Sequence, residues 1–242
     1  MKYHWFVLLI VIAGFVSCKK TAGTTSKIMV LNATYSIPAL AAELNGIPIT
    51  NTALSQGQVS GTANAPYQNL PAGTNNIVLK SGTNILSDKN LYTGPANGYS
   101  ILVYDTSQLA VSTINTLILT DDLTLPDTAS IRLRFINCVP DTLLTDVVLV
   151  NISGADSVLL LSNAPFIGAA ASATSVEVFN AIKYHGQAYN IKVKKAGSQE
   201  LLAAENNYVF IEREIYSFVF SGLPAGNGAT ARKLLVVHHA FQ

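Results

Sequence analysis

The stretch YSILV at residues 99–103 decides the fold, because it recurs as YSFVF at residues 216–220. Each stretch is a short run of apolar and β-branched residues, which is typical of a β-strand buried in a sheet. A second pair, LIL at 117–119 and LLV at 234–236, follows at the same offset of 117 residues. Two matches at one offset indicate two copies of one structural unit.

Two further matches lie earlier in each copy. VLNA at 30–33 matches FINC at 135–138, and NIVLK at 76–80 matches NIKVK at 190–194. Their offsets are 105 and 114 residues, and insertions in the second copy explain the drift.

The segment TDDLTLPDTAS at residues 120–130 falls between the copies. Pro126 ends regular structure there, and Asp127-Thr128 favours a turn. A length of 242 residues suits two units, since domains usually hold roughly 100–200 residues. We expect β-sandwich domains at residues 27–125 and 126–242.

Both copies are predicted to be all-β, because their apolar runs are short and bounded by Gly, Pro, Asn and Asp. The alanine-rich pieces at 39–44 and 169–173 are too short to form helices alone. About seven strands in roughly 100 residues favour an immunoglobulin-like β-sandwich. The clearest expected strands cover residues 27–33, 76–80, 99–104 and 115–120 in the first copy, and 131–137, 146–152, 187–194, 208–212, 216–221 and 233–240 in the second.

The N-terminus predicts export. Lys2 is followed by an apolar run at residues 5–15, which as a helix spans about 16 Å, roughly half of a bilayer core. A secretory signal peptide over residues 1–17 is therefore favoured over a membrane-spanning anchor.

The residues FVSC at 15–18 resemble a bacterial lipobox, although Phe15 replaces the usual Leu. That resemblance implies cleavage before Cys18, which then carries the lipid, and residues 18–26 form a flexible linker. Acyl chains on one residue hold a soluble domain at a bilayer. Lys19 in place of Asp after the cysteine resembles outer-membrane sorting. The interpretation is an outer-membrane lipoprotein, with its periplasmic or surface orientation open.

The repeat resembles the family catalogued as domain of unknown function 4397. The resemblance rests on Asn after the first apolar strand, on LPAGTNNIVLKSG at 70–82 and on GYSILV at 98–103. In the second copy, AIKYHGQAYNIKVK at 181–194 keeps a glycine at Gly186 and loses the Leu-Pro pair. The family occurs as tandem copies in secreted and lipid-anchored bacterial proteins, often from Bacteroidota. It brings no established activity, so the resemblance implies no catalytic residues.

Composition argues against several functional classes. With 15 Lys+Arg against 14 Asp+Glu, the chain lacks the excess of basic residues that a nucleic-acid binder uses. Two cysteines cannot make a disulfide-stapled scaffold. Hydrolase motifs such as G-x-S-x-G and H-E-x-x-H and the phosphate-binding glycine loops are absent from the sequence. We therefore expect no catalytic residues and no cofactor.

Metal binding is not expected either. His238 and His239 are neighbours on a predicted strand, so they point to opposite faces, and a solvated strand end is favoured. His185 sits in an expected turn and should be exposed. Asp121, Asp122 and Asp127 near the junction could offer oxygens to calcium, but ordinary linker polarity is favoured because no calcium-loop pattern is present.

Cys138 is the remaining thiol once Cys18 is acylated. Its counterpart in the first copy is Ala33, so the position is predicted to need only a small side chain. Strand parity leaves its burial open, because it shares a face with Arg132, Arg134 and Ile136.

Three Asp-Ser/Thr-apolar triplets resemble the O-glycosylation acceptor of exported Bacteroidota proteins. They place candidate modification at Thr128, Thr142 and Ser157. Asp-Thr also simply forms turns, so both interpretations stay open.

The many tyrosines have two interpretations, a binding face or ordinary half-buried strand positions. They are Tyr67, Tyr92, Tyr99 and Tyr104 in the first copy and Tyr184, Tyr189, Tyr208 and Tyr216 in the second. The favoured function is a non-enzymatic envelope lipoprotein that binds carbohydrate, peptide or a partner protein. The alternatives are a structural spacer in an outer-membrane assembly and a glycan-active accessory hydrolase.

Overall fold

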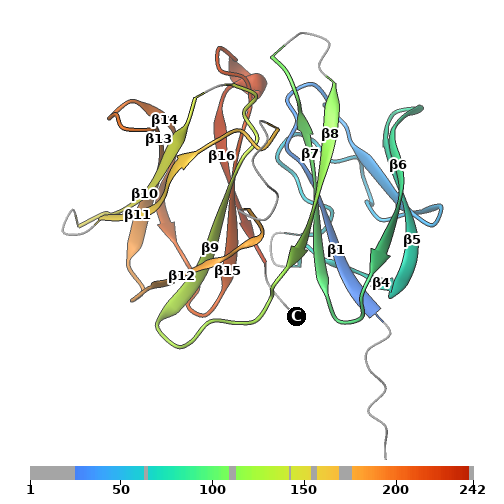
Figure 1. The fold of residues 1–242 in the computed structure, drawn as a ribbon, viewed down its shortest axis with the longest axis horizontal. Helices are drawn as coiled ribbons and strands as arrows, with labels where there is room; N and C mark the ends of the chain where they lie inside the picture. Colours follow the sequence, from blue (N-terminus) through green and yellow to red (C-terminus); the bar gives the residue numbers. More distant parts are fainter. Residues whose placement is uncertain are drawn as a thin grey trace, which may run out of the picture.

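The structure is a computed structural model that describes residues 25–62, 65–108, 113–141, 143–153, 157–168 and 176–239. These residues form two β-sandwiches that lie side by side (Figure 1). No described strand of one sandwich pairs with a strand of the other. The change falls between Asp121, which ends β8, and Ser130, which begins β9. The all-β fold with two tandem sandwiches is confirmed.

Each sandwich has an inner sheet, which faces the other sandwich, and an outer sheet. In the first sandwich the inner sheet has the order β4 (Gln68–Pro71), β1 (Thr25–Asn32), β7 (Gly98–Asp105) and β8 (Ile114–Asp121). Its outer sheet has the order β3 (Ile47–Pro48), β2 (Ala41–Leu44), β5 (Gly73–Ser81) and β6 (Asn84–Thr93).

The second sandwich repeats this order strand for strand. Its inner sheet is β12 (Asn180–Lys183), β9 (Ser130–Asn137), β15 (Ile215–Ser221) and β16 (Lys233–His238). Its outer sheet is β11 (Ser157–Ala164), β10 (Thr145–Asn151), β13 (Ala188–Lys195) and β14 (Leu201–Val209). A short 3₁₀ turn, Gly228–Thr230, lies between β15 and β16.

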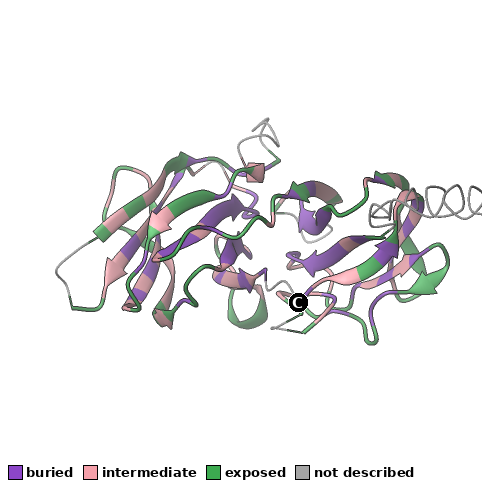
Figure 2. Cartoon of the chain, turned by 90° about the horizontal axis from the view of Figure 1, so that it is seen from below, coloured by how far each residue is buried: buried purple, intermediate pink, exposed green. Residues whose placement is uncertain are grey.

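The central pair of each inner sheet is parallel. β1 pairs with β7 and β9 with β15, with Val30 opposite Ile101 and Phe135 opposite Phe218. Every residue of β7 and β15 is buried, which explains why YSILV and YSFVF are apolar without alternation. One face of each strand packs in its own sandwich, and the other faces the neighbouring sandwich. The strands in the middle of the molecule accordingly carry the longest runs of buried residues (Figure 2).

Each sandwich has its own apolar core between its two sheets. The first core includes Ile28, Val30 and Ile101, and the second includes Leu133, Phe135 and Phe218. Burying an aliphatic or aromatic side chain of this size contributes about 1.5–3 kcal/mol. These cores come from the repeated strands, so each copy supplies one complete sandwich.

The same tyrosine fixes the start of the central strand in both sandwiches. The hydroxyl of Tyr99 accepts a hydrogen bond from the backbone N–H of Gly94, and that of Tyr216 accepts one from Ile211, each at 2.8 Å. The bond runs back five residues, as in the tyrosine corner of immunoglobulin-like sandwiches.

Several strands differ from the sequence prediction. Five strands at sheet edges were not expected: β3, β4, β6, β11 and β12. The alanine-rich piece at 39–44 contains strand β2 and forms no helix, whereas the piece at 169–173 lies outside the described residues. A strand was expected at 208–212, but β14 ends at Val209 and Phe210 turns into the core. Edge strands expose many side chains, so their sequences lack a strong apolar signal.

Candidate functional site

The facing inner sheets share a third apolar core, here called the interface core. It contains Leu31, Leu102 and Leu119 of the first sandwich, and their counterparts in the second are Ile136, Val219 and Val237. The interface therefore has the composition of a domain interior, and it joins the two sandwiches into one packed body.

A buried ion pair crosses the interface beside this core. Arg134 Nη1 of β9 lies 2.7 Å from Asp121 Oδ1 at the end of β8, and both side chains are at most 1% exposed. The guanidinium also lies 4.3 Å from the centre of the Phe179 ring. Two charges removed from water are stable only where their remaining polar atoms are hydrogen-bonded.

Hydrogen bonds lead from Arg134 to Asp121 through three other side chains. Arg134 Nε donates to Ser217 Oγ at 2.6 Å, so the Ser217 hydroxyl proton is directed to His239 Nε2, also at 2.6 Å. His239 Nδ1 then donates to the hydroxyl of Tyr67 at 2.6 Å. Tyr67 donates to Asp121 Oδ2 at 2.7 Å. This direction of the protons requires a neutral histidine protonated on Nδ1.

Ser100 closes the network from the other side. Arg134 Nη2 donates to Ser100 Oγ at 3.3 Å, and Ser100 donates to Asp121 Oδ2 at 2.6 Å. Burial alone would raise the pKa of the Asp121 carboxyl, but attraction to Arg134 and the hydrogen bond from Ser100 hold it below its usual value. Asp121 is therefore ionised at neutral pH.

Burial and the charge of Arg134 lower the pKa of His239 to about 3, in agreement with the neutral ring. Ser217 and His239 have the contact of a nucleophile and its base. However, both side chains are at most 2% exposed. The Ser217 oxygen already accepts from Arg134, and His239 Nε2 already accepts from Ser217. The arrangement holds the two sandwiches in one orientation.

The network is built from equivalent positions of the two copies. Ser100 and Ser217 correspond, and each directly follows the tyrosine at the second position of the central strand. Tyr67 directly precedes β4, and Phe179 directly precedes the equivalent strand β12. Both rings contact His239, with centroids 5.8 and 5.4 Å from the imidazole.

The pairing of the last strand in each copy, β8 and β16, shows that the match of LIL at 117–119 with LLV at 234–236 is one residue out of register. Tyr99 lies opposite Thr120, whereas Tyr216 lies opposite His238, so the offset on this strand is 118 and not 117. Asp121 and His239 are therefore equivalent positions. The second copy therefore has one additional residue between β15 and β16. With the offset of 118, Leu119 corresponds to Val237, and both lie in the interface core, whereas an offset of 117 would have assigned each residue to the wrong face.

The two C-terminal histidines point to opposite faces, as expected, but the solvated strand end was wrong for His239. His239 is buried in the network, whereas His238 stacks on Tyr216 at 4.7 Å and lies 3.2 Å from Glu214 Oε2. His185 is exposed, as expected.

Linker polarity was likewise wrong for Asp121, which is the buried acceptor of the network. Asp122 instead pairs with Arg132 at 2.7 Å, and hydrogen bonds from Arg132 and Thr124 lower its pKa to about 2. Asp127 is exposed. Over the described ranges, no three His, Cys, Asp or Glu side chains are placed to hold a metal ion.

Cys138 is buried in the interface core, which answers the question left open by strand parity. Burial raises the pKa of its thiol far above the ordinary value, so the side chain is an unreactive apolar group. Its counterpart in the first copy, Ala33, lies in the same core.

A groove of about 940 Å³ runs beside the interface. One wall comes from the first sandwich and carries exposed polar side chains, among them Asn51, Thr52 and Gln58. The other wall comes from the end of β14 with Tyr208, and residues 234–238 of β16 line the groove as well. Its volume lies in the range of ligand sites, roughly 300–1,000 Å³.

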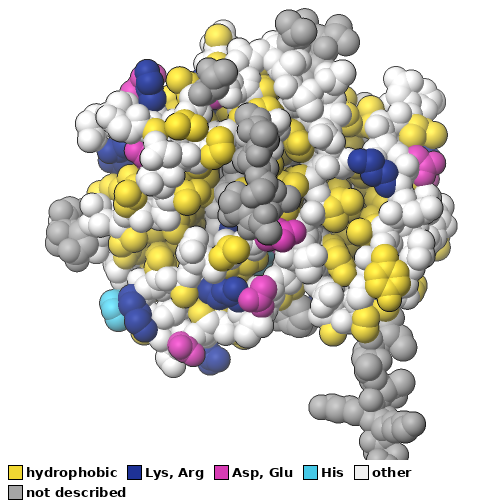
Figure 3. Space-filling model, viewed as in Figure 1, with side chains coloured by type: hydrophobic (Ala, Val, Ile, Leu, Met, Phe, Trp, Pro, Cys, Tyr) yellow, Lys and Arg dark blue, Asp and Glu magenta, His cyan; other side chains and the backbone are white. Residues whose placement is uncertain are grey.

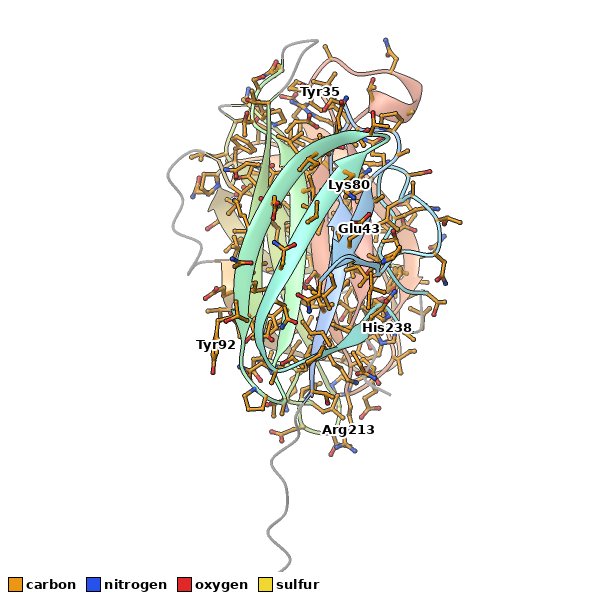
Figure 4. The ribbon with its side chains drawn as sticks, turned by 90° about the vertical axis from the view of Figure 1, so that its right-hand side faces the viewer. Tyr35, Glu43, Lys80, Tyr92, Arg213 and His238 are labelled. Atoms are coloured by element: carbon orange, nitrogen blue, oxygen red, sulfur yellow. The ribbon has the colours of Figure 1, made fainter. Side chains whose placement is uncertain are left out.

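The tyrosines do not gather into one exposed face. Tyr92 is 71% exposed on β6 and points outward near one end of the outer sheet, away from the paired Glu43 and Lys80 (Figure 4). Tyr208 is partly exposed at the groove, and Tyr67 is partly exposed at the interface. The remaining five are buried: Tyr99, Tyr104, Tyr184, Tyr189 and Tyr216.

The predicted modification sites are only partly within the described residues. Thr128 is exposed in the connection between the sandwiches, and Ser157 is exposed at the start of β11. Thr142, Cys18 and the whole of the expected signal peptide lie outside the described residues. Among described residues, no helix is long and apolar enough to cross a membrane.

A family model described as "Domain of unknown function (DUF4397)" matches residues 26–148, just over half of the chain, which include the first sandwich and β9. No curated protein matches the sequence significantly. Among solved structures, a leucine-rich repeat protein from Bacteroides thetaiotaomicron is similar at 9% identity with a TM-score of 0.20. The alignment covers 81% of this chain and 26% of that chain, so this chain spans about a quarter of that protein's length.

Proposed function

The chain belongs to the DUF4397 family, and from that premise we propose that it is a non-enzymatic lipoprotein of the bacterial outer membrane that binds a ligand between its two sandwiches. The family description names no activity. The proposal therefore rests on the geometry of this chain and on its N-terminal sequence.

The groove beside the interface carries the proposal. Its walls come from different sandwiches, and the buried Arg134–Asp121 network holds those sandwiches in one orientation. A site whose walls are already in place loses little conformational entropy when a ligand binds. Binding also suits the polar amides and hydroxyls of Asn51, Thr52 and Gln58, which are exposed along one wall. Carbohydrate, peptide and partner protein are the ligand classes under this proposal.

Attachment to the membrane follows from Cys18 in the lipobox-like FVSC sequence. Only six residues separate Cys18 from Thr25, where β1 begins, so the linker is short. Thr128 and Ser157 are accessible to O-glycosylation, and Thr142 is a third candidate. An intact mass from the native host equal to the lipidated, unglycosylated chain would contradict that modification.

Two experiments test the proposal. Radiolabelled palmitate should enter the wild-type protein and not a Cys18→Ser variant, and an unlabelled wild-type protein would contradict the anchor. The fragment of residues 19–242, which holds every described strand, should bind a member of a glycan or peptide panel. Thr52→Trp, which fills the groove from an exposed wall position, should abolish that binding, whereas Thr116→Trp on β8 should not. A protein that is lipidated but binds nothing would favour the spacer instead.

A further inference from the structure

Strand β16 has a free edge. It pairs with β15 on one side, and no described strand pairs with its other side. The backbone N–H of His239 donates to the carbonyl of Ile215 at 2.8 Å, so odd-numbered positions direct their backbone groups toward β15. Backbone groups alternate in direction along an antiparallel strand. Those of Leu234, Val236 and His238 therefore point outward, and within the described part of the chain no partner is recorded for them.

This edge opens into the groove, since all five residues at positions 234–238 line it. The equivalent edge in the first sandwich, on β8, borders an opening of only about 10 Å³ between β6 and β8. Apolar side chains gather over that part of the first sandwich, where Leu91 and Ile118 line the opening (Figure 3). The two copies thus share an edge strand, but among the described residues the edge of β16 lies in a groove of ligand size, whereas that of β8 does not.

The groove also carries a carboxylate. Glu205 lies on its wall, and no ion pair to Glu205 is recorded over the described ranges. Burial raises the pKa of the nearby Tyr208, and the negative charge of Glu205 raises it further. The other carboxylate at this end, Glu214, is already paired with His238. No Lys or Arg is among the described residues that line the groove, so a basic side chain on a ligand would complement Glu205.

We propose that the groove binds an extended peptide with a basic side chain, which adds to β16 as a further strand. Backbone hydrogen bonds would join the peptide to Leu234, Val236 and His238, and its basic side chain would pair with Glu205. Strand addition of this kind gives affinity through the backbone and specificity through side-chain pockets. The six residues of β16 span about 20 Å, so the bound segment has about six residues. This inference rests on the proposed function, because it identifies the ligand of the same groove.

The test uses a capped synthetic peptide, Thr-Val-Thr-Lys-Val-Thr-Val-Thr, and the ¹⁵N-labelled fragment 19–242. The amide signals of Leu234, Val236 and His238 should shift, and their hydrogen exchange should slow, as peptide is added. The equivalent outward amides of β8, at Thr116, Ile118 and Thr120, serve as the internal control and should not change. N-methylation at alternate peptide positions should abolish binding in one register and leave it in the other.

Two protein variants separate the backbone from the charge. Val236→Pro removes an outward N–H without removing a bond to β15 and should weaken binding at least tenfold, whereas Ile118→Pro on β8 should not. Glu205→Gln keeps the fold and should weaken binding of the lysine peptide several-fold, with no effect on a peptide in which Thr replaces Lys.

The inference is overturned if the β16 amides do not respond at millimolar peptide, or if both N-methylated registers bind equally. Binding of a neutral oligosaccharide at Thr52 and Tyr208 without any response of the β16 amides would also overturn it. In that case the proposed function would stand, because the groove would still hold a ligand.

Discussion

The two sandwiches have the same strand order but differ where they meet. Ser100 and Ser217 keep the same residue, whereas Met29 corresponds to Arg134, Asp121 to His239 and Tyr67 to Phe179. The differences are complementary, since the cation of one copy faces the anion of the other. Two first copies would bury Asp121 without a cation, and two second copies would bury Arg134 without an anion. Divergence at a few buried positions therefore makes each face fit the other and not itself.

The largest expected effect comes from making the second copy resemble the first. Arg134→Met introduces the residue found at position 29 and leaves the Asp121 carboxylate buried without its partner. Breaking a buried pair in this way costs about 3–5 kcal/mol. Urea unfolding of the 19–242 fragment measures the loss.

The matched control is Arg134→Met combined with Asp121→Asn, which removes both charges. It should recover more than half of the lost stability, because the remaining groups are neutral. A loss below about 1 kcal/mol in the single variant would mean that the ion pair does not hold the sandwiches together.

A smaller effect is expected from pH, because His239 is the titratable base that replaces Asp121 in the second copy. Its pKa is about 3 in the folded protein, below the ordinary value near 6.5. Between these values the unfolded chain binds a proton that the folded chain does not, so stability is present above pH 6.5 and is lost as the pH falls. The slope approaches about 1.4 kcal/mol per pH unit.

Unfolding curves at pH 7, 6, 5 and 4 for the wild type and His239→Gln measure this term. The variant should lose the slope attributed to His239, and the exposed His185→Gln should keep it. Equal slopes in all three proteins would contradict the buried neutral histidine.

The shared tyrosine gives an effect that should be equal in both copies. Tyr99→Phe and Tyr216→Phe each leave a backbone N–H, of Gly94 or Ile211, without its acceptor. Because both hydrogen bonds are only partly buried, each substitution should cost about 0.5–1.5 kcal/mol. Thermal or urea unfolding of the two variants checks this, and a large difference between them would show that the corner supports only one sandwich.

The smallest effect belongs to the exposed pair of the connection. Asp122 pairs with Arg132, two positions before Arg134 on β9, but more than half of the Asp122 side chain is exposed. Asp122→Asn should therefore change stability by less than about 1 kcal/mol, and 1 M NaCl should remove the difference. A loss as large as that of Arg134→Met would contradict the contrast between the buried and exposed pairs.

The sequence predicted the parts of the fold that carry a local signal. Residues 99–103 and 216–220 gave both the repeat and the all-β class, because strands buried on both faces are continuously apolar. Strand β6, with the sequence NILSDKNLYT, was missed because an exposed edge strand needs no apolar face.

The interface network was missed for a different reason. Asp121 and His239 stand at the ends of their strands among polar residues, so each looked like part of a connection or a chain end. Their burial depends on how the two sandwiches pack against each other, as in the contact between Tyr67 and His239, and periodicity along the sequence does not report such contacts. One signal was available: strands apolar on both faces need a second packed layer, and one sandwich supplies only one. The groove could not be predicted, because its two walls belong to different copies.

The position of β1 has a mechanical consequence for a chain tethered at its N-terminus. β1 lies between β4 and β7 and runs parallel to β7, with six register pairs from Lys27–Gly98 to Asn32–Val103. Tension applied at Thr25 runs along the strand, so it loads these hydrogen bonds together in shear and does not unzip them one by one. Drag on a bound ligand would thus be borne by the part of the first sandwich that is hardest to pull apart.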